Sequence, residues 1–505
     1  MPRSDAGLGD RQRALAGFLK TETGADAVEI TRIELLAGGA IQENWGIDAS
    51  FAGGRLPGLQ RLVLRTDAAT GVPSSLGRIE EFQVLNAVFA AGVSVPEPLF
   101  ACADETVIGK PFFVMRRVAG SAAGRPITLD PALESARPAL AARLGGELAR
   151  LQTVRPPRPD LSFLPPDDGP LPRIAGFRAY LDAHPNPRPV LEWALRWAER
   201  HLPEPLPPVL CHRDFRTGNY LLDGTRLTAI VDWEFTGWGD PDEDIGWLCC
   251  KGWRFGRLDR EAGGVAERAP FYRGYEAESG RRLDPRRLRF WEVFANIRWA
   301  IIALQQSDRF LVGGARHLST AITGRRATEC ELELLMLLDR AGPPSQSAPA
   351  GGGGGAGFRD LPTSRDLMAL ARELLLDELA PLLPAERRRD AHLIATVMAI
   401  TARERDGEGW QEEIAAALAE FYDHNPAPTP PRLRGMGLAP SAQWSGWGYD
   451  DTLLRRFAAD QRNGAFETSP SRAAASRAIL WRLTMGKLRE GNPHFLAANG
   501  LGEAT

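Results

Sequence analysis

The residue types that could do chemistry gather between His212 and Glu234. The sequence reads HRDFRTGN from His212 to Asn219, and Asp232 follows within IVDWE. Phosphoryl transfer needs a carboxylate that accepts the proton of an attacking hydroxyl, and oxygen ligands for Mg²⁺. Asp214 suits the first role, and Asn219 with Asp232 suits the second, because Mg²⁺ binds one or two protein oxygens in addition to substrate phosphates. The pattern predicts ATP-dependent phosphoryl transfer; the alternative is a chance match in a loop, where Asp and Asn are common.

The local sequence also predicts how these residues meet. Two short apolar runs flank Asp223-Gly224, which is a two-residue hairpin turn signal. Simple pairing about that turn sets Asn219 opposite Thr228. Asp232 would then lie beyond the mouth of the hairpin, and the chain must curl back for Asn219 and Asp232 to share an ion.

Length and composition exclude several classes of protein. At 505 residues the chain predicts two to four domains, given about 100 to 200 residues per domain. A hydrophobic fraction of 44% with 25% charged residues is typical of an ordinary soluble protein. The formal net charge of -3 gives no reason to expect nucleic acid or an anionic membrane as a partner. Nothing resembling an Ala-Pro-Glu segment follows Asp232, so the groove that protein kinases use for peptide substrates is not indicated, and a small-molecule hydroxyl is the favoured acceptor.

The cysteines and the apolar stretches indicate a cytoplasmic protein. The five cysteines are odd in number and lack paired metal spacing, which fits a reducing cytosol better than a disulfide framework. The first twenty residues lack an apolar core long enough for a signal peptide. The apolar stretch Val293–Leu304 is interrupted by Arg298 and is far shorter than the ~20 residues needed to span a bilayer.

One domain boundary is visible in the composition. Residues 341–358 read AGPPSQSAPAGGGGGAGF, a Pro/Gly segment that cannot bury enough apolar surface to offset its ordering entropy. It predicts a flexible linker. The expected organisation is an N-terminal helical segment, a sheet-rich lobe, a helical lobe that carries the catalytic loop, the linker and a helical C-terminal domain, at residues 1–24, 25–118, 119–340, 341–358 and 359–505.

The region before residue 118 predicts a small sheet-rich lobe. Ile30–Leu36, Trp45–Ala49 and Arg61–Arg65 have the composition of strands. Gly38 and Gly39, between the first two, would let backbone N–H groups approach a nucleotide phosphate without interference from a Cβ atom. The alternative for this glycine pair is a simple hairpin turn.

Arg65 ends the third expected strand, where it could reach nucleotide phosphates. Glu81 lies in the helix expected over Leu76–Ala90, so the two residues form a strand-cation and helix-carboxylate pair of the kind seen in kinases. The alternatives are a solvated charge for Arg65 and a surface carboxylate for Glu81. Glu80 could serve equally well as the partner.

The segment around Met115 predicts the connection between two lobes. An apolar strand, FFVM, ends at Met115 and leads into Arg116, Arg117 and Gly120. Backbone groups from Met115 to Arg117 would hydrogen-bond an adenine edge. A buried strand without a ligand is the alternative.

Beyond Gly120 the apolar residues recur at three- and four-residue intervals, which predicts helices. The expected helices before the linker are Pro131–Leu151, Val190–His201, Ala262–Ser279, Pro285–Gln305 and Ala315–Asp339. Those after it are Arg365–Leu379, Glu386–Arg403, Gln411–Tyr422, Asp451–Ala459 and Ser471–Arg489, which indicate a small bundle. The pattern predicts an α+β, two-lobed architecture followed by an all-α domain.

Eight motifs occur in order along residues 25–340. They are Leu36-Ala37-Gly38-Gly39, Val63-Leu64-Arg65, Glu81-Phe82, Val95-Pro96-Glu97-Pro98, Met115, His212-x-Asp214 to Asn219, Ile230-Val231-Asp232-Trp233-Glu234 and Gly239-Asp240-Pro241. Together they resemble the aminoglycoside phosphotransferase family, whose fold is protein-kinase-like. The subset that the chain resembles most is related to the kinase-like part of certain acyl-CoA dehydrogenases, which act on hydroxyacyl thioesters. The C-terminal part is similar to an uncharacterised helical domain appended to such proteins.

The resemblance implies a role for each matched residue. Asp214 is the implied catalytic base, Asn219 and Asp232 are the implied Mg²⁺ ligands, and Arg65 takes the position of the phosphate-binding Lys with Glu81 as its partner. Arg65 is a departure, because the planar guanidinium of Arg is not interchangeable with the point charge of Lys.

Arg216, two residues after Asp214, could neutralise charge on the transferring phosphoryl group. Its alternative role is a salt bridge within the loop.

Two classes of function follow. The first is an enzyme that transfers the γ-phosphoryl group of ATP, with Mg²⁺, to the hydroxyl of a small molecule; a hydroxyacyl-CoA is favoured over an aminoglycoside as acceptor. The second is a non-catalytic nucleotide-binding module that signals through the C-terminal helices.

Overall fold

A computed structural model describes most of the chain. The described residues are 5–36, 42–68, 75–184, 186–311, 323–339, 341–342, 364–406, 410–424 and 452–501. The chain forms two compact units, and each is described by itself. Unit 1 comprises Met1–Gly169 with Glu204–Trp291, and unit 2 comprises Pro170–Pro203 with Glu292–Thr505.

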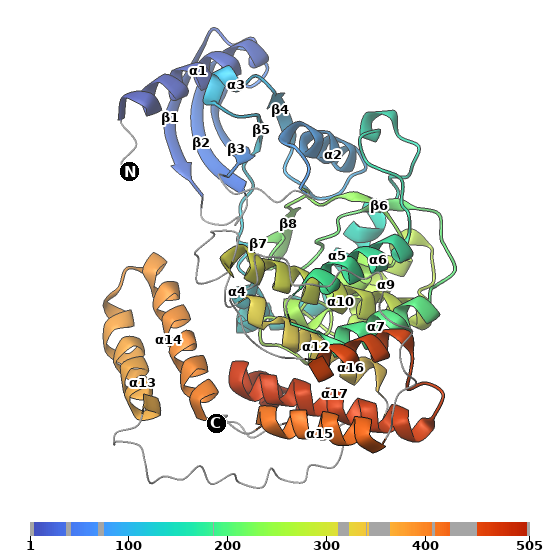
Figure 1. Cartoon of the computed structure of the whole chain (residues 1–505). Coiled ribbons are helices and arrows are strands. Elements are labelled where there is room, and N and C mark those ends of the chain that lie inside the picture. The colour runs from blue at the N-terminus through green and yellow to red at the C-terminus, as the bar shows by residue number, and fades with distance from the viewer. Residues whose placement is uncertain are drawn as a thin grey trace. The chain divides into compact units, whose positions relative to one another are not determined.

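The N-terminal part of unit 1 contains an antiparallel sheet of five strands (Figure 1). Its order is β1-β2-β3-β5-β4, formed by Ala27–Leu35, Gln42–Ala52, Gly58–Asp67, Phe112–Arg116 and Pro98–Cys102. The strands that the sequence predicts over Ile30–Leu36, Trp45–Ala49 and Arg61–Arg65 correspond to β1, β2 and β3. Strand β4 was not expected from the sequence, since its apolar run is short and contains a proline.

Successive side chains along each strand point to opposite faces of this sheet. Apolar side chains on each face pack against a helix. Phe112 and Val114 pack with Leu15 and Leu19 of α1 (Asp5–Thr23). Phe113 packs instead in the core that includes the buried residues of α2 (Arg78–Ala90). The short α3 (Glu105–Ile108) precedes β5. Strand β3 is therefore held between two helices, with its C-terminal end, including Arg65, beside α2.

The rest of unit 1 carries the motif segment on short strands backed by helices. The strands form two antiparallel pairs: β6 (Val209–Cys211) with β9 (Gly237–Gly239), and β7 (Tyr220–Asp223) with β8 (Arg226–Ile230). The helices of this part are α4 (Gly124–Leu129), α5 (Arg137–Leu151), α8 (Glu243–Cys249), α9 (Arg268–Ser279) and the first residues of α10 (Pro285–Leu311).

Glycine lets α5 and α9 approach one another closely. A Cβ atom on Gly274 would lie 1.9 Å from the carbonyl oxygen of Ala142, and one on Gly145 would lie 2.2 Å from that of Phe271. The sequence prediction of a helix over Ala262–Ser279 is wrong for its first turn. Gly263 and Gly264 have φ values of +60° and +75°, which end any right-handed helix there, so α9 begins only at Arg268.

Unit 2 consists of helices (Figure 1). They are α6 (Pro170–Ala183), α7 (Pro189–Arg200), the remainder of α10, α12 (Ala327–Leu338), α13 (Ser364–Glu373), α14 (Ala385–Asp406), α15 (Trp410–His424), α16 (Thr452–Asn463), α17 (Pro470–Gly491) and α18 (Pro493–Ala498). Unit 2 also contains a 3₁₀ segment at Ala380–Leu382 and a π-helical segment at Leu374–Leu379, whereas the 3₁₀ segments at Pro131–Ala136, Pro159–Leu161 and Lys251–Trp253 belong to unit 1.

Ion pairs and buried hydrogen bonds join the C-terminal helices to earlier ones within unit 2. Arg462 of α16 contacts Glu192 of α7 (2.6 Å) and Asp182 of α6 (2.6 Å). The indole N–H of Trp481 donates to Asp339 (2.9 Å). The predicted helices after the linker are confirmed, while nearly all of the expected linker lies outside the described residues. None of the described helices is long and apolar enough to cross a membrane.

Candidate active site

The hairpin β7–β8 places the motif residues. Its pairing sets Tyr220 opposite Ile230, with an irregularity between Leu221 and Leu222. Asn219 therefore lies opposite Val231, whose N–H donates to the Asn219 carbonyl (2.9 Å). The sequence prediction of Asn219 opposite Thr228 is wrong, because the turn lies at Gly224-Thr225 and the irregularity shifts the register further.

Asp232 follows the hairpin in an unusual backbone conformation. Its φ is +74°, in the left-handed region that non-glycine residues seldom adopt. The backbone therefore changes direction at Asp232, directly after Val231, which pairs with Asn219. That Asn219 and Asp232 share an ion stays a prediction. The Asp232 carboxylate accepts a hydrogen bond from Nη2 of Arg65 (2.7 Å). Burial opposes ionisation of Asp232, but the adjacent Arg65 guanidinium outweighs it and lowers the pKa of this carboxyl.

Arg65 is buried between two carboxylates. Its Nε lies 3.0 Å from Oε1 of Glu81 on α2, and Nη1 lies 3.4 Å from Oδ1 of Asn44. Glu81 also pairs with Arg78. Burial alone would lower the pKa of Arg65, yet the charges of Glu81 and Asp232 raise it above its ordinary value. The cation is held in place and stays charged.

Glu80 takes a different role from its neighbour. Its carboxylate accepts the backbone N–H of Gly77 (2.9 Å) at the start of α2. Of the two carboxylates that the sequence offered as a partner for Arg65, Glu81 is the one that forms the ion pair.

Glu234 connects this cluster to β2. Its Oε2 accepts hydrogen bonds from Gln42 (2.9 Å) and Ser75 (2.6 Å). Burial and the charge of Asp232 raise the pKa of Glu234. The sequence motif includes Glu234 but gave no indication of its partners. Gln42 and Ser75 are single polar residues that belong to no motif.

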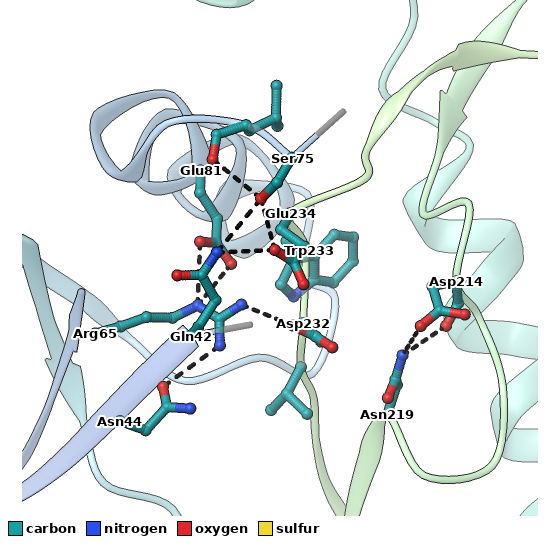
Figure 2. Close-up of polar contacts among 12 residues, drawn as sticks. Gln42, Asn44, Arg65, Ser75, Glu81, Asp214, Asn219, Asp232, Trp233 and Glu234 are labelled. Carbon is teal, nitrogen blue, oxygen red and sulfur yellow. Dashed lines mark hydrogen bonds and ion pairs between the residues drawn. The ribbon is translucent and has the colours of Figure 1, made fainter. Parts of the chain in front are cut away.

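The carboxylate of Asp214 lies on the other side of the view in Figure 2. Its Oδ1 accepts hydrogen bonds from the indole N–H of Trp247 (2.8 Å) and from Nε of Arg216 (3.0 Å). Its Oδ2 accepts from Nδ2 of Asn219 (2.5 Å), which also donates to the Asp214 carbonyl (3.0 Å). Three donors fix the orientation of this carboxylate, and the Asn219 amide oxygen is turned away from it.

Two buried side chains hold the loop that carries Asp214. Asp244 accepts the backbone N–H groups of His212 (2.7 Å) and Arg213 (2.8 Å). His212 accepts the N–H of Asp214 at Nδ1 (3.2 Å), so its Nε2 carries the proton that bonds the Val231 carbonyl (3.1 Å). Burial lowers the pKa of His212, which is consistent with a neutral ring. The loop and the end of the hairpin are thereby tied together.

Arg216 forms the salt bridge with Asp214 that was its alternative role, and it also packs on an aromatic ring. Its guanidinium carbon lies 4.5 Å from the centroid of the Trp253 ring. Trp247 and Trp253 contact one another at 5.1 Å between centroids.

The sequence-based search missed Asp244, Trp247 and Trp253. The one available signal was the acidic run from Asp240 to Asp244, which overlaps the motif Gly239-Asp240-Pro241.

Four residues predicted to contact the nucleotide remain to be placed. Gly38 and Gly39 lie outside the described residues. Met115 is at the end of β5 opposite Val63, and the backbone N–H of Arg117 donates to the Arg61 carbonyl (2.9 Å). That N–H is thus already used within the protein.

The two expected metal ligands offer atoms suited to Mg²⁺. Asn219 presents its amide oxygen and Asp232 its second carboxylate oxygen, and among the described residues neither atom has a hydrogen-bond partner. Hard oxygen donors of this number are what Mg²⁺ takes from proteins that bind it together with phosphates. The donor set fits the ion.

A family model confirms the relationship that the motifs indicate. The model described as phosphotransferase enzyme family matches residues 33–291, more than half of the chain. The chain belongs to the phosphotransferase enzyme family. The match ends at the residue where unit 1 ends, so the family domain and unit 1 share their C-terminal limit.

Similar proteins show how far the likeness of this phosphotransferase family member extends. Acyl-CoA dehydrogenase family member 10 of Mus musculus is 30% identical over 203 residues, covering 39% of this chain and 18% of that protein. Acyl-CoA dehydrogenase family member 11 of Homo sapiens is 28% identical over 194 residues, covering 37% and 25%. The matched region is thus a quarter or less of either relative.

A solved structure confirms the predicted fold. A candidate aminoglycoside phosphotransferase from Ralstonia eutropha JMP134 superimposes with a TM-score of 0.53 and 21% identity, covering 64% of this chain and 97% of that chain. The two-lobed kinase-like fold, with a sheet-rich N-terminal lobe and a helical C-terminal lobe, is therefore shared.

Proposed function

We propose that this phosphotransferase family member transfers the γ-phosphoryl group of ATP to a hydroxyl group of a small molecule. The observation that carries the proposal is the pair of clusters in Figure 2: Asp214 hydrogen-bonded to Asn219, and Asp232 ion-paired with Arg65, linked by the backbone bond between Val231 and Asn219. One cluster suits proton transfer and the other suits binding of phosphates.

Asp214 is the proposed catalytic base. As the acceptor oxygen forms its bond to the γ-phosphorus, the hydroxyl proton passes to the Asp214 carboxylate, and the bond from the γ-phosphorus to the bridging oxygen breaks with release of ADP. The hydrogen bonds from Trp247, Arg216 and Asn219 hold the carboxylate in one orientation before the acceptor arrives. Such orientation is a large part of what enzymes supply to phosphoryl transfer.

Asn219 and Asp232 are the proposed ligands of Mg²⁺. When bound, the ion neutralises charge on the nucleotide phosphates and orients them. Asp232 keeps one oxygen on Arg65, so its remaining oxygen is the donor toward the ion.

Arg65 is the proposed partner of the nucleotide phosphates, and Glu81 positions it. Arg216 is placed to neutralise charge near the acceptor oxygen, since it already contacts Asp214.

The adenine edge is assigned to backbone groups from Met115 onward. The N–H groups of Arg116 and Arg117 donate to the carbonyls of Glu97 and Arg61, both at 2.9 Å. The N–H of Val118 donates no hydrogen bond among the described residues. Val118, next along the chain, is the preferred donor to adenine.

A hydroxyacyl-CoA is the favoured acceptor and an aminoglycoside the less favoured one. The support is the similarity to two acyl-CoA dehydrogenase family members, each covering more than a third of this chain. The neighbour from Ralstonia eutropha supports only the fold, so it does not favour an aminoglycoside.

The test is Mg²⁺-dependent ATP consumption with a panel of hydroxyacyl-CoAs, small alcohols and aminoglycosides. Asp214→Asn is compared with Asp223→Asn, which changes an exposed carboxylate at the turn of the same hairpin. We expect turnover with one acceptor class, a loss of about 10²–10⁴-fold in Asp214→Asn, and none in the control. Nucleotide binding by calorimetry should be retained in both variants.

Two other results would change the proposal. Mg²⁺-dependent ATP binding without turnover on any acceptor would favour the non-catalytic nucleotide-binding module. Turnover that Asp214→Asn leaves unchanged would remove Asp214 from the role of base.

A further inference from the structure

Unit 2 contains a cavity, and most of its lining residues lie outside the region that the family model matches. Its volume is about 410 Å³, within the usual range for small-molecule sites. Residues from five regions line it: the α6–α7 connection, α10, the segment from Gly324 to Thr328, the start of α15 and the end of α17. All of these belong to unit 2. We call it the unit 2 cavity.

Cationic side chains outnumber carboxylates in the lining. Arg188, Arg325 and Lys487 line the cavity, whereas Glu490 is the one carboxylate among the described lining residues. Oε1 of Glu490 accepts the indole N–H of Trp410 (2.6 Å). The electrostatic character of the lining therefore favours an anion.

The guanidinium of Arg188 has donors that none of the described residues accepts. Only 8% of Arg188 is exposed, and its Nε lies 2.9 Å from Oε1 of Glu331. That contact is an ion pair without hydrogen-bond geometry: among the described residues, Nε and Nη2 of Arg188 both lack a hydrogen-bond partner. A buried donor left without an acceptor costs about 1–3 kcal/mol, so such a group is rare unless something else binds it.

Trp410 gives the cavity a rigid aromatic wall. A Cβ atom on Gly486 would lie 2.4 Å from Cε3 of Trp410, so the indole rests directly on the backbone of α17. The hydrogen bond to Glu490, one helical turn further along α17, fixes the orientation of the ring. Leu304 and Leu488 add apolar surface to the same cavity.

We propose that the unit 2 cavity binds a small anionic molecule with a planar or apolar body. Its carboxylate or phosphate group would lie near Arg188, Arg325 and Lys487, and its body would lie against Trp410. This site is separate from the proposed phosphotransfer chemistry and does not depend on it. Because residues of α15 and α17 complete the lining, the C-terminal helices have a ligand-binding role.

Calorimetry on the full chain tests this with three probes: benzoate, phenyl phosphate and the neutral benzyl alcohol. We expect one of the two anions to bind at a 1:1 ratio and the alcohol not to bind. The stronger anion identifies whether the site prefers a carboxylate or a phosphate.

Lys487→Met should weaken binding about tenfold or more, since it removes a charge at the cavity. Arg482→Met makes a comparable change at an exposed position of the same helix and should leave binding unchanged. Arg325→Met, also at an exposed residue, is a second variant in case Lys487→Met does not fold.

Three outcomes would overturn the proposal. Neither anion saturates the chain at millimolar concentration, or Lys487→Met and Arg325→Met bind as the unchanged chain does, or Mg·ATP displaces the anion. The last result would place the probe in the candidate active site instead.

Discussion

The candidate active site and the unit 2 cavity differ in how their polar groups are satisfied. In the candidate active site Asp214 accepts three donors and Arg65 lies between Glu81 and Asp232, and the atoms left without a described partner are acceptors, one oxygen each of Asn219 and Asp232. In the cavity, Arg188 is buried with donors that no described residue accepts. A site for catalysis is pre-organised by its own contacts, whereas a site that only binds can leave a donor for its ligand.

The two sites also differ in their spread along the chain. Asp214, Asn219 and Asp232 come from one loop and one hairpin, so a short motif identifies them. The residues that line the cavity are scattered along the chain, the first being His184 and the last Gly491. A chemical site can therefore be read from local spacing, while a cavity between helices depends on packing that spacing does not encode.

Asp244→Ala would break the pre-organisation of the active site and is expected to have the largest effect. It leaves the buried N–H groups of His212 and Arg213 without their acceptor, at about 1–3 kcal/mol each. We expect the free energy of unfolding to fall by about 2–6 kcal/mol and phosphoryl transfer to be lost. Thermal unfolding and ATP consumption measure the two effects.

Asp223→Ala is the matched control for that variant, because Asp223 is an exposed carboxylate in the same unit. If both variants unfold at the same temperature, the catalytic loop does not depend on Asp244.

Arg462→Met applies the same reasoning to unit 2. Only 3% of the Glu192 side chain is exposed, and Arg462 contacts it along with Asp182. Removing the cation leaves a buried carboxylate with Arg178 at 3.8 Å, so we expect a loss of about 2–3 kcal/mol in unfolding free energy. Urea unfolding measures it, with the exposed Arg489→Met as control.

Arg462→Met should also affect ligand binding at the two sites differently. Anion binding to the unit 2 cavity should weaken in Arg462→Met, and ATP binding should not change. Equal loss of both activities would show that the two sites are not independent.

Sequence reasoning succeeded for features that depend on local spacing. The hairpin, the family and the fold are confirmed, while the roles of Asp214, Asn219 and Asp232 stay predictions. The register of the hairpin was wrong because a turn signal does not reveal an irregularity such as the one between Leu221 and Leu222.

What the sequence could not show are contacts made at long range. Asp244 and Trp247 reach the catalytic loop from α8, about thirty residues further along the chain, at no characteristic spacing. The orientation of Arg188 toward Glu331 depends on how α7 meets α12, which helical periodicity leaves undetermined.

Trp247→Phe tests whether the partners of Asp214 matter to its chemistry. It keeps an aromatic ring in the core and removes the N–H that donates to Oδ1 of Asp214. If the hydrogen bond positions the base, kcat should fall about tenfold while the KM for ATP stays unchanged.

Trp45→Phe removes an indole N–H bonded to Glu43 (3.2 Å), a carboxylate outside the site, and is the matched control. A fall in kcat of the same size in both variants would argue against a positioning role for Trp247.

The smallest expected effect concerns the buried histidines, one in each site. Burial lowers the pKa of His212 and also that of His184, which lines the cavity. Between the lowered pKa in the folded chain and the ordinary value of about 6.5, the unfolded chain binds a proton that the folded chain does not, so stability rises with pH. The contribution is complete above about pH 6.5 and is lost as pH falls through the folded-state pKa.

His212→Gln should reduce this pH dependence, because a glutamine amide can accept the Asp214 N–H and donate to Val231 without titrating. Urea unfolding from neutral to acidic pH measures the slope, which one proton limits to about 1.4 kcal/mol per pH unit. His184→Gln should reduce the slope independently, so the two changes should add. If neither variant alters the slope, both rings have the same proton affinity in the folded and unfolded chain. The inference that a neutral His212 orders the catalytic loop would then be wrong.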